Sequence, residues 1–376
     1  MVGMINSTFM LARNMVASPM LIISRKQSVM SSVRGTVGIL TLNRPKALNA
    51  LNLEMIRTLT PLLKQWETGK EGVEVVLIKG EGGKAFCAGG DIRAITEVPG
   101  GEVQKQFFTE EYQLDYLVGR LAIPYVSIMN GITMGGGVGI SVNGKYRVAT
   151  EKTVFAMPET GIGLVPDVGG GFFLPRMKGE LGMFLGLTGH RLKGWDCLHA
   201  GVATHAIKGD MVEQLEEALV GLGVGDDENV KKVLDEFLPE EARNHKFSLN
   251  NDMEEINRIF SANTVEEIVQ RLKAEKSELS ARALKSMEAA SPTSLKVAYR
   301  QIREGKKLNT LEDVLKMEYR LVTRCCQDKD FYEGVRAALI DRDNKPAWVP
   351  NKLEKVLTDK VDWYFSHLSE SEELIL

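Results

Sequence analysis

Hydrophobic positions along the chain fall into two alternating patterns. Residues 37–42, 73–79 and 125–129 are short, mostly apolar runs, which predict strands buried in a sheet. Between the first two runs, apolar residues recur at three- to four-residue intervals or their multiples, which predicts a helix with one apolar face: Leu53, Ile56, Leu63 and Trp66. Strands that alternate with helices in this way are typical of an α/β (α+β) fold.

The pattern changes after about Gly221, where the sequence becomes charged and helix-forming and offers few strand candidates. A chain of 376 residues is long enough for two units, or for one large domain with an appendage. We therefore predict a core over residues 31–225 and a helical C-terminal region over residues 226–376.

The first 53 residues contain no acidic residue, and Arg13, Arg25, Lys26 and Arg34 lie there among Ser, Met, Leu and Ala. This composition is typical of a mitochondrial transit peptide. We predict such a peptide over residues 1–30 and import into the mitochondrial matrix; the alternative is an end with no targeting role.

No apolar run reaches the roughly 18 residues of a membrane-spanning helix, so no membrane partner is expected.

Charge and cysteine content exclude other classes of function. Lys and Arg number 47 against 50 Asp and Glu, with no basic block, so we expect no nucleic-acid partner. The four cysteines form no C-x-x-C pair, which favours a reducing compartment. Cys197, His199 and His205 are the only candidate metal ligands close in sequence, and no further pair stands at metal-site spacing, so we expect no metal.

Three glycine-rich segments, residues 82–91, 130–139 and 155–171, carry the candidate chemistry. Successive glycines let a ligand approach main-chain N–H groups without meeting a Cβ atom. The third segment also contains Glu159 and Asp167, each directly after a proline, so both carboxylates are expected on loops.

The order and spacing of these segments resemble the crotonase (enoyl-CoA hydratase) superfamily. The resemblance rests on residues 86–91, 135–139 and Pro158-Glu159, and it extends over residues 36–350. Further blocks resemble the 3-hydroxyisobutyryl-CoA hydrolase branch of that superfamily: residues 158–171, 330–337 and 341–343, and Trp348. The resemblance implies a crotonase-like spiral of ββα units followed by a helical C-terminal region.

The resemblance also assigns an oxyanion hole to the N–H groups of Gly90 and Gly136. Thioester hydrolysis places negative charge on the former carbonyl oxygen, and two preorganised N–H donors stabilise that charge. Gly136 is expected to begin a helix, where unsatisfied N–H groups favour an anion. The alternative for both glycines is a tight turn or close packing.

Three acidic residues match acidic positions of the hydrolases. Glu159 matches the catalytic carboxylate, which acts as general base on water or as nucleophile; the sequence leaves both open. Asp167 matches a second acid, suited to holding the substrate's hydroxyl group or handling a proton; its alternative is an N-cap for a following helix. Glu111 matches a glutamate near the acyl group, and its alternative is a solvated helix face.

Gly139 separates the subfamilies. The resemblance places there the second glutamate of the hydratases, which adding water across a double bond requires. A missing acid–base partner typically costs about 10²- to 10⁴-fold in rate. Thioester hydrolysis depends less on it because the thiolate is already a good leaving group, so the sequence favours a hydrolase.

The resemblance further implies contacts to coenzyme A. The adenine is expected against main chain at Lys84, Ala85 and Phe86, and the phosphates near Lys46 and Arg93. The alternative for the two cations is ordinary solvation.

The resemblance implies a hydrolase that releases 3-hydroxyisobutyrate and CoA in valine breakdown, with 3-hydroxypropionyl-CoA as a further candidate substrate. No cofactor is expected beyond the CoA of the substrate, and the superfamily's trimers and hexamers make a homo-oligomer an option. Two alternatives stay open at this point: a hydratase or isomerase of enoyl-CoA, and a structural or binding protein, such as a component of mitochondrial ribosomes.

Overall fold

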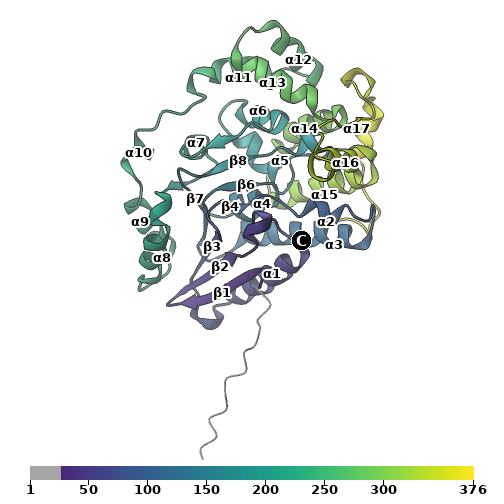
Figure 1. Ribbon diagram of the computed structural model, residues 1–376. Coiled ribbons are helices and arrows are strands. Elements are labelled where there is room, and N and C mark those ends of the chain that lie inside the picture. The colour runs from purple at the N-terminus through teal and green to yellow at the C-terminus, as the bar shows by residue number, and fades with distance from the viewer. Residues whose placement is uncertain (1–26) are drawn as a thin grey trace, which may run out of the picture.

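Two β-sheets form the centre of the structure, a computed structural model that describes residues 27–376 (Figure 1). The predicted transit peptide therefore falls almost entirely outside the described residues. The larger sheet has the order β1-β2-β3-β5-β7-β10: Val29–Arg34, Val37–Leu42, Val75–Gly80, Tyr125–Met129, Tyr146–Ala149 and His205–Ala206. The smaller sheet has the order β4-β6-β8-β9: Ala85–Cys87, Ile132–Met134, Val154–Ala156 and Leu192–Lys193.

From β3 to β8 the chain alternates between the two sheets, and helices follow each pair of strands. Pairing is parallel throughout, except for the edge pairs β1 with β2 and β8 with β9. This arrangement confirms the predicted spiral of ββα units. The helices of this part are α1 to α7: Leu53–Glu67, Ile92–Ile95, Glu102–Arg120, Gly136–Val142, Gly170–Phe173, Leu181–Thr188 and Asp196–His199.

The larger sheet is covered on both faces, which explains the uninterrupted apolar runs. In β2, Leu40 and Leu42 point into the main core, whereas Val37 and Ile39 pack toward α8 (Val212–Val220) and α9 (Asp227–Glu236). A sheet buried on both sides needs apolar residues at every position. The strands predicted at residues 37–42 and 125–129 are β2 and β5; the one predicted at 73–79 begins two residues later, as β3.

The predicted amphipathic helix is α1. Asn52 caps it by accepting a hydrogen bond from the Met55 N–H at 2.9 Å. Its apolar face is buried, including Trp66 near its C-terminal end. The Trp66 ring packs so closely on Gly38 of β2 that a Cβ atom at Gly38 would overlap it. The helix therefore packs closely on the sheet at a position where only glycine leaves enough room.

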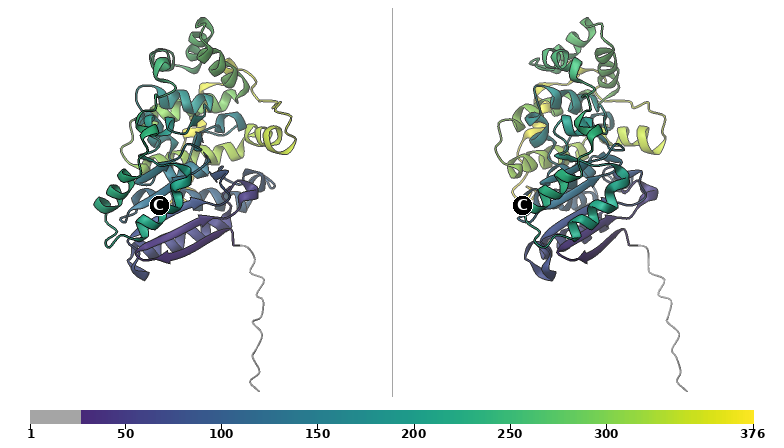
Figure 2. Two further views of the ribbon diagram at one scale, coloured as in Figure 1. Left: turned by 60° about the vertical axis from the view of Figure 1, so that its left-hand side comes forward. Right: turned by 90° about the vertical axis from the view of Figure 1, so that its left-hand side faces the viewer.

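The C-terminal part is helical, as predicted, and no strand follows β10 in the described residues. Residues 253–289, green in Figure 2, lie at the end of the molecule opposite the purple strands. Most buried residues from Leu249 onward belong to the same hydrophobic cluster as the core, which extends from Val29 to Leu374, whereas Val230 and Leu234 pack with α8 against the other face of the larger sheet. The division at residue 225 falls between the packed helices α8 and α9 and stays a prediction. The remaining helices are α10 to α17: Glu240–Arg243, Met253–Phe260, Val265–Ala274, Glu278–Ala289, Pro292–Gly305, Leu311–Gln327, Lys329–Val335 and Thr358–Phe365.

Candidate active site

A cavity of about 480 Å³ lies between the glycine turns, helix α3 and the loop after β8. Three of its four acidic lining residues, Glu111, Glu159 and Asp167, are almost fully buried, and Asp91 is partly exposed; cations stand at exposed positions of the lining. The structure thus brings together seven of the residues predicted from the sequence: Lys46, Gly90, Arg93, Glu111, Gly136, Glu159 and Asp167.

The two predicted N–H donors stand side by side. Gly90 follows β4, and Gly136 is the first residue of α4, as predicted. The Gly90 nitrogen lies 3.4 Å from the point where a Cβ on Gly136 would stand. Gly135 makes the approach possible with φ 46° and ψ −126°, a conformation that side chains disfavour. Within the described residues neither N–H has a protein acceptor, so both remain available to a ligand.

Glu159 lies next to these donors. It opens a short 3-10 helix, Glu159–Ile162, directly after Pro158, and only 4% of it is exposed. Its Oε1 lies 3.4 Å from the Cβ position of Gly135, and its Oε2 has no hydrogen-bond partner in the described chain. Burial raises the pKa of Glu159 well above the ordinary value, and the charge of Asp167 raises this pKa further.

Asp167 lines the same cavity and is 4% exposed. Its Oδ2 accepts a hydrogen bond from the Tyr112 hydroxyl at 3.0 Å. Burial raises its pKa to about 7, and the hydrogen bond from Tyr112 opposes this rise. The alternative of an N-cap is wrong, because α5 begins at Gly170 and is capped by Gly169 without a side-chain hydrogen bond.

Glu111 comes from α3 and is only 2% exposed, so it does not lie on a solvated helix face. Its Oε1 has no hydrogen-bond partner in the described residues and lies against the Cα atom of Gly136. Burial raises the pKa of Glu111 well above the ordinary value, and the charge of Asp167 adds to this. The cavity lining therefore holds three buried carboxyl groups whose raised pKa values favour their protonated forms.

Asp115, one helical turn after Glu111, is a residue that the sequence analysis missed. It is fully buried, and neither carboxylate oxygen has a partner among the described residues. Burial raises its pKa, and Glu111 and then Asp167 raise it further. A Cβ on Gly139 would lie 2.7 Å from the Asp115 carboxyl carbon, so Asp115 occupies the space that a side chain at position 139 needs. The four-residue spacing from Glu111 on a largely buried helix was the available signal.

C-terminal helices hold the loop that carries Asp167. Glu318 of α15 accepts hydrogen bonds from the N–H groups of Gly169 at 2.7 Å and Gly171 at 2.6 Å. Gln301 of α14 donates to the Pro166 carbonyl at 2.6 Å and to Glu318 at 2.9 Å. Burial raises the pKa of Glu318 to about 8, and the two main-chain hydrogen bonds oppose this rise. Sequence reasoning did not find these residues.

The loop that carries Glu159 is held in a similar way. Gly163 and Gly334 leave room for close contact between this loop and α16: a Cβ on Gly163 would meet the Asp330 main chain, and a Cβ on Gly334 would meet that of Ile162. The Ser291 hydroxyl donates to Asp330 at 2.6 Å, and the Ser291 N–H donates to the Thr160 carbonyl at 3.0 Å. The block at residues 330–337 thus supports the acid loop.

The residues expected to contact adenine do not line the cavity. Ala85 and Phe86 are buried in β4, and Lys84 precedes it on the surface. The Lys84 carbonyl already accepts a hydrogen bond from the Ile132 N–H, and the Ala85 carbonyl accepts one from the Asn49 side chain. Their contact with adenine stays a prediction.

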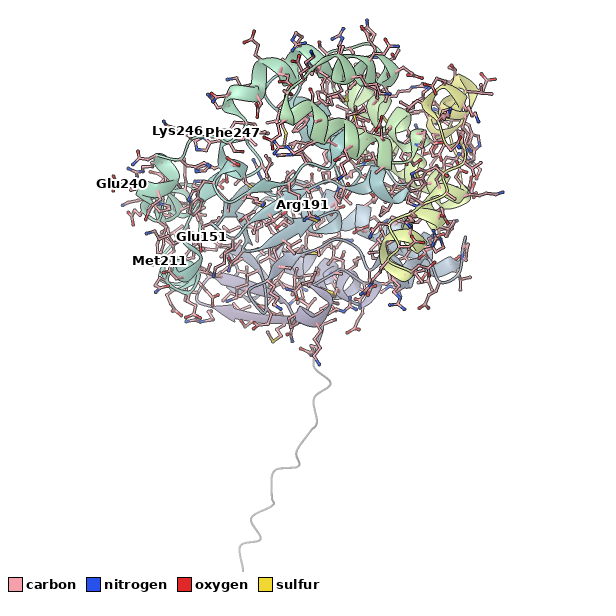
Figure 3. The ribbon with its side chains drawn as sticks, turned by 45° about the horizontal axis from the view of Figure 1, so that its top comes forward. Glu151, Arg191, Met211, Glu240, Lys246 and Phe247 are labelled. Carbon is pink, nitrogen blue, oxygen red and sulfur yellow. The ribbon has the colours of Figure 1, made fainter. Side chains whose placement is uncertain are left out.

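The candidate metal ligands lie in separate contacts. The ring of His199 packs near those of His245 and Phe247, the last labelled in Figure 3, whereas His205 faces Asp235 at 3.4 Å. Residues 27–376 contain no group of three His, Cys, Asp or Glu side chains arranged to hold a metal ion. The same residues contain no helix long and apolar enough to cross a bilayer.

Comparison with known proteins decides the family. A family model described as enoyl-CoA hydratase/isomerase matches residues 37–365. The chain belongs to this family. Among its relatives in the enoyl-CoA hydratase/isomerase family, a mitochondrial 3-hydroxyisobutyryl-CoA hydrolase of Xenopus laevis is 52% identical over 342 residues, covering 90% of this chain and 88% of the relative. The Homo sapiens protein of the same name is 50% identical over 350 residues, covering 92% and 90%.

Two solved structures that resemble this chain carry hydratase or dehydratase names. A crystal structure of a carnitinyl-CoA dehydratase from Mycobacterium thermoresistibile has a TM-score of 0.86 and 36% identity, covering 93% of this chain and 98% of that one. An enoyl-CoA hydratase from Rhodobacter sphaeroides 2.4.1 has a TM-score of 0.83 and 35% identity, covering 93% and 100%. The crotonase fold is therefore established. Because the relatives carry both hydrolase and hydratase names, the choice between the two reactions rests on the residues of the site.

Proposed function

We propose that the protein hydrolyses 3-hydroxyisobutyryl-CoA to 3-hydroxyisobutyrate and CoA, as part of valine breakdown. The observation that carries this proposal is the place of Glu159, which lies beside two adjacent N–H donors without acceptors in the described residues, in a cavity that no side chain from position 139 enters. The names of relatives that share about half of the sequence support it. The same cavity makes 3-hydroxypropionyl-CoA, which lacks one methyl group, a further candidate substrate.

The geometry supports the following reaction. The N–H groups of Gly90 and Gly136 stabilise the negative charge that develops on the thioester oxygen. Glu159 takes a proton from the attacking water, or attacks the acyl carbon itself to give an anhydride that water then opens. The C–S bond breaks, and CoA leaves as the thiolate. Asp167 holds the substrate's hydroxyl group or receives a proton, and no cofactor beyond the substrate's own CoA takes part.

A hydratase activity is the second candidate, because the solved structures carry hydratase and dehydratase names. The cavity argues against it. Hydration needs an acid and a base on the two sides of a double bond, and position 139 has no side chain to supply the second group beside Glu159, so Asp167 would have to supply it. Asp115 fills the space behind Gly139 but does not line the cavity.

Two assays on one preparation test the proposal. Thiol release from 3-hydroxyisobutyryl-CoA is measured beside hydration of crotonyl-CoA, each with wild-type protein and with Glu159→Gln. We expect thiol release by the wild type that the substitution abolishes, and hydration near the background rate. Faster hydration than hydrolysis would refute the proposed reaction.

We also propose import into mitochondria, because the relatives' names include that compartment and the sequence shows an acid-free, Arg-containing start. N-terminal sequencing of protein purified from mitochondria tests this: we expect a start near residue 30, whereas a start at Met1 would contradict it. A homo-oligomer remains a proposal that sedimentation of the same sample checks.

A further inference from the structure

The lining of the cavity carries a third cation that the sequence analysis did not assign. Lys46, Arg93 and Arg342 line the cavity at exposed positions. In the described part of the chain, none of their side chains forms an ion pair or a hydrogen bond. Lys46 and Arg93 belong to the core, whereas Arg342 comes from the C-terminal helical part, after the π-helical turn Arg336–Ile340.

The loop around Arg342 is held by a neighbouring arginine. The Arg336 guanidinium donates to Asp341 at 2.6 Å and to Asp343 at 2.9 Å, and it also forms two hydrogen bonds with Glu333. Both acids that flank Arg342 are therefore engaged by Arg336 and do not neutralise Arg342. Arg342 therefore adds its positive charge to those of Lys46 and Arg93 in the cavity lining.

The backbone of the loop shows the same constraint. Arg342 has φ 59° and Asn344 has φ 52°, the left-handed region that side chains rarely adopt. Such conformations persist where surrounding contacts fix them, and they gather at ligand-binding sites. Here the contacts are the Arg336 cluster and the Asn344 N–H, which donates to the Ala337 carbonyl at 3.1 Å.

We infer that Arg342 binds a phosphate group of the CoA portion of the substrate, and that Arg336 is the positioning residue that holds its loop. The inference rests on the substrate class proposed above. A guanidinium presents a planar fork of donors that matches phosphate oxygens, and an arginine without a protein partner is free to use it. The cations line the cavity at exposed positions and the acids at buried ones, so a phosphate held by Arg342 orients the ligand with its acyl end inward.

Calorimetric titration with CoA and with pantetheine, which lacks phosphate, tests the inference without turnover. For Arg342→Gln we expect the ratio of the CoA to the pantetheine Kd to rise about tenfold, and the salt dependence of CoA binding to weaken. Arg336→Gln should raise the ratio in the same direction, because its loop is released. Lys345→Gln removes an equal charge from the same loop, outside the cavity lining, and should leave the ratio unchanged.

An unchanged ratio for Arg342→Gln, or equal losses for both ligands, would overturn the role of Arg342. An unchanged ratio for Arg336→Gln would overturn the positioning role. A wild-type protein that binds CoA with the expected ratios but releases no thiol from any β-hydroxyacyl-CoA would refute the proposed function and leave this inference standing. Failure of the wild type to bind CoA would refute both.

Discussion

The two glycine turns and the two acid-bearing loops meet in one cavity but are built differently. The turns that carry Gly90 and Gly136 are fixed by nearby strands and helices of the core; for example, the Leu51 N–H donates to the Gly89 carbonyl at 2.8 Å. The loop that carries Asp167 depends on Glu318, which is 149 residues away from Gly169. The proposed oxyanion donors are therefore fixed by the core, whereas the two acid-bearing loops are held by the C-terminal helices.

The difference has an electrostatic side. The acid half of the site contains Glu111, Asp115, Glu159, Asp167 and Glu318, all buried, and the causes that shift their pKa values include burial and each other's charges but no cation. Burial without a counter-charge favours retention of protons. The site therefore carries less negative charge than five ordinary carboxyl groups would.

Removing the base should have the largest effect. We expect Glu159→Gln to lower kcat for thiol release by about 10³-fold or more, because the amide neither accepts a proton nor attacks the acyl carbon. Stopped thiol-release assays check this against Glu213→Gln, an exposed glutamate on α8. Comparable activity of the two variants would remove Glu159 from the mechanism.

A methyl group at Gly136 should be nearly as damaging. A Cβ there would collide with the Glu111 carboxylate and lie 3.2 Å from Leu51, so the N–H would be displaced from the oxyanion. We expect Gly136→Ala to lower kcat by about 10²- to 10³-fold. Gly161→Ala is the matched control, since a Cβ at Gly161 meets no atom within 4 Å.

The charge of the acids predicts the pH dependence. Glu159 must be ionised to act as base or nucleophile, and a carboxylate whose pKa is raised is ionised only at higher pH, so hydrolysis should rise with pH above the range in which an ordinary glutamate titrates. Asp167→Asn removes a charge that raises the pKa of Glu159, so the rising limb should move to lower pH. A limb that stays in place would show that the two acids are not coupled.

Glu318→Gln tests the C-terminal half of the comparison. The glutamine can accept from only one of the two glycine N–H groups, and the unpaired one should cost about 1–3 kcal/mol of unfolding free energy. We expect kcat to fall about tenfold as the Asp167 loop shifts. Glu312→Gln on the same helix removes a surface pair with Lys316 and should change stability by less than about 0.5 kcal/mol.

The smallest effect concerns Gly139 and Asp115. We expect Gly139→Ala to destabilise the fold by about 1–3 kcal/mol, because its Cβ would overlap the buried carboxyl group. Adding Asp115→Ala makes room, so the double variant should be more stable than the sum of the single changes requires. Denaturant unfolding of all four proteins measures this; strict additivity would show that the two residues do not compete for space.

Much of the fold could be predicted from the sequence, because buried strands such as β2 and β5 are continuous apolar runs with clear ends. Gly136 and Glu159, which the family resemblance assigned to the site, both line the cavity, and their roles stay predictions. The position of Glu111 required knowledge of which face of α3 is buried.

Asp115 and Glu318 could not be predicted in this way. The first is defined by the packing of α3 against α4, and the second by hydrogen bonds to residues far away in the sequence. A helical pattern shows which face is apolar but does not identify the partner of that face. Arg342 was part of a recognised block, yet only the loop geometry relates it to the cavity.

The contacts of Gln301, Glu318 and α16 with the acid loops have a consequence for synthesis. A chain that stopped before Gln301 would already contain every strand of the described structure and every group assigned to the reaction, but neither loop would have its support. During translation, the acid-bearing loops would therefore reach their final positions only after helices α14 to α16 have left the ribosome. A late stop codon should inactivate the enzyme as completely as a change in its active site.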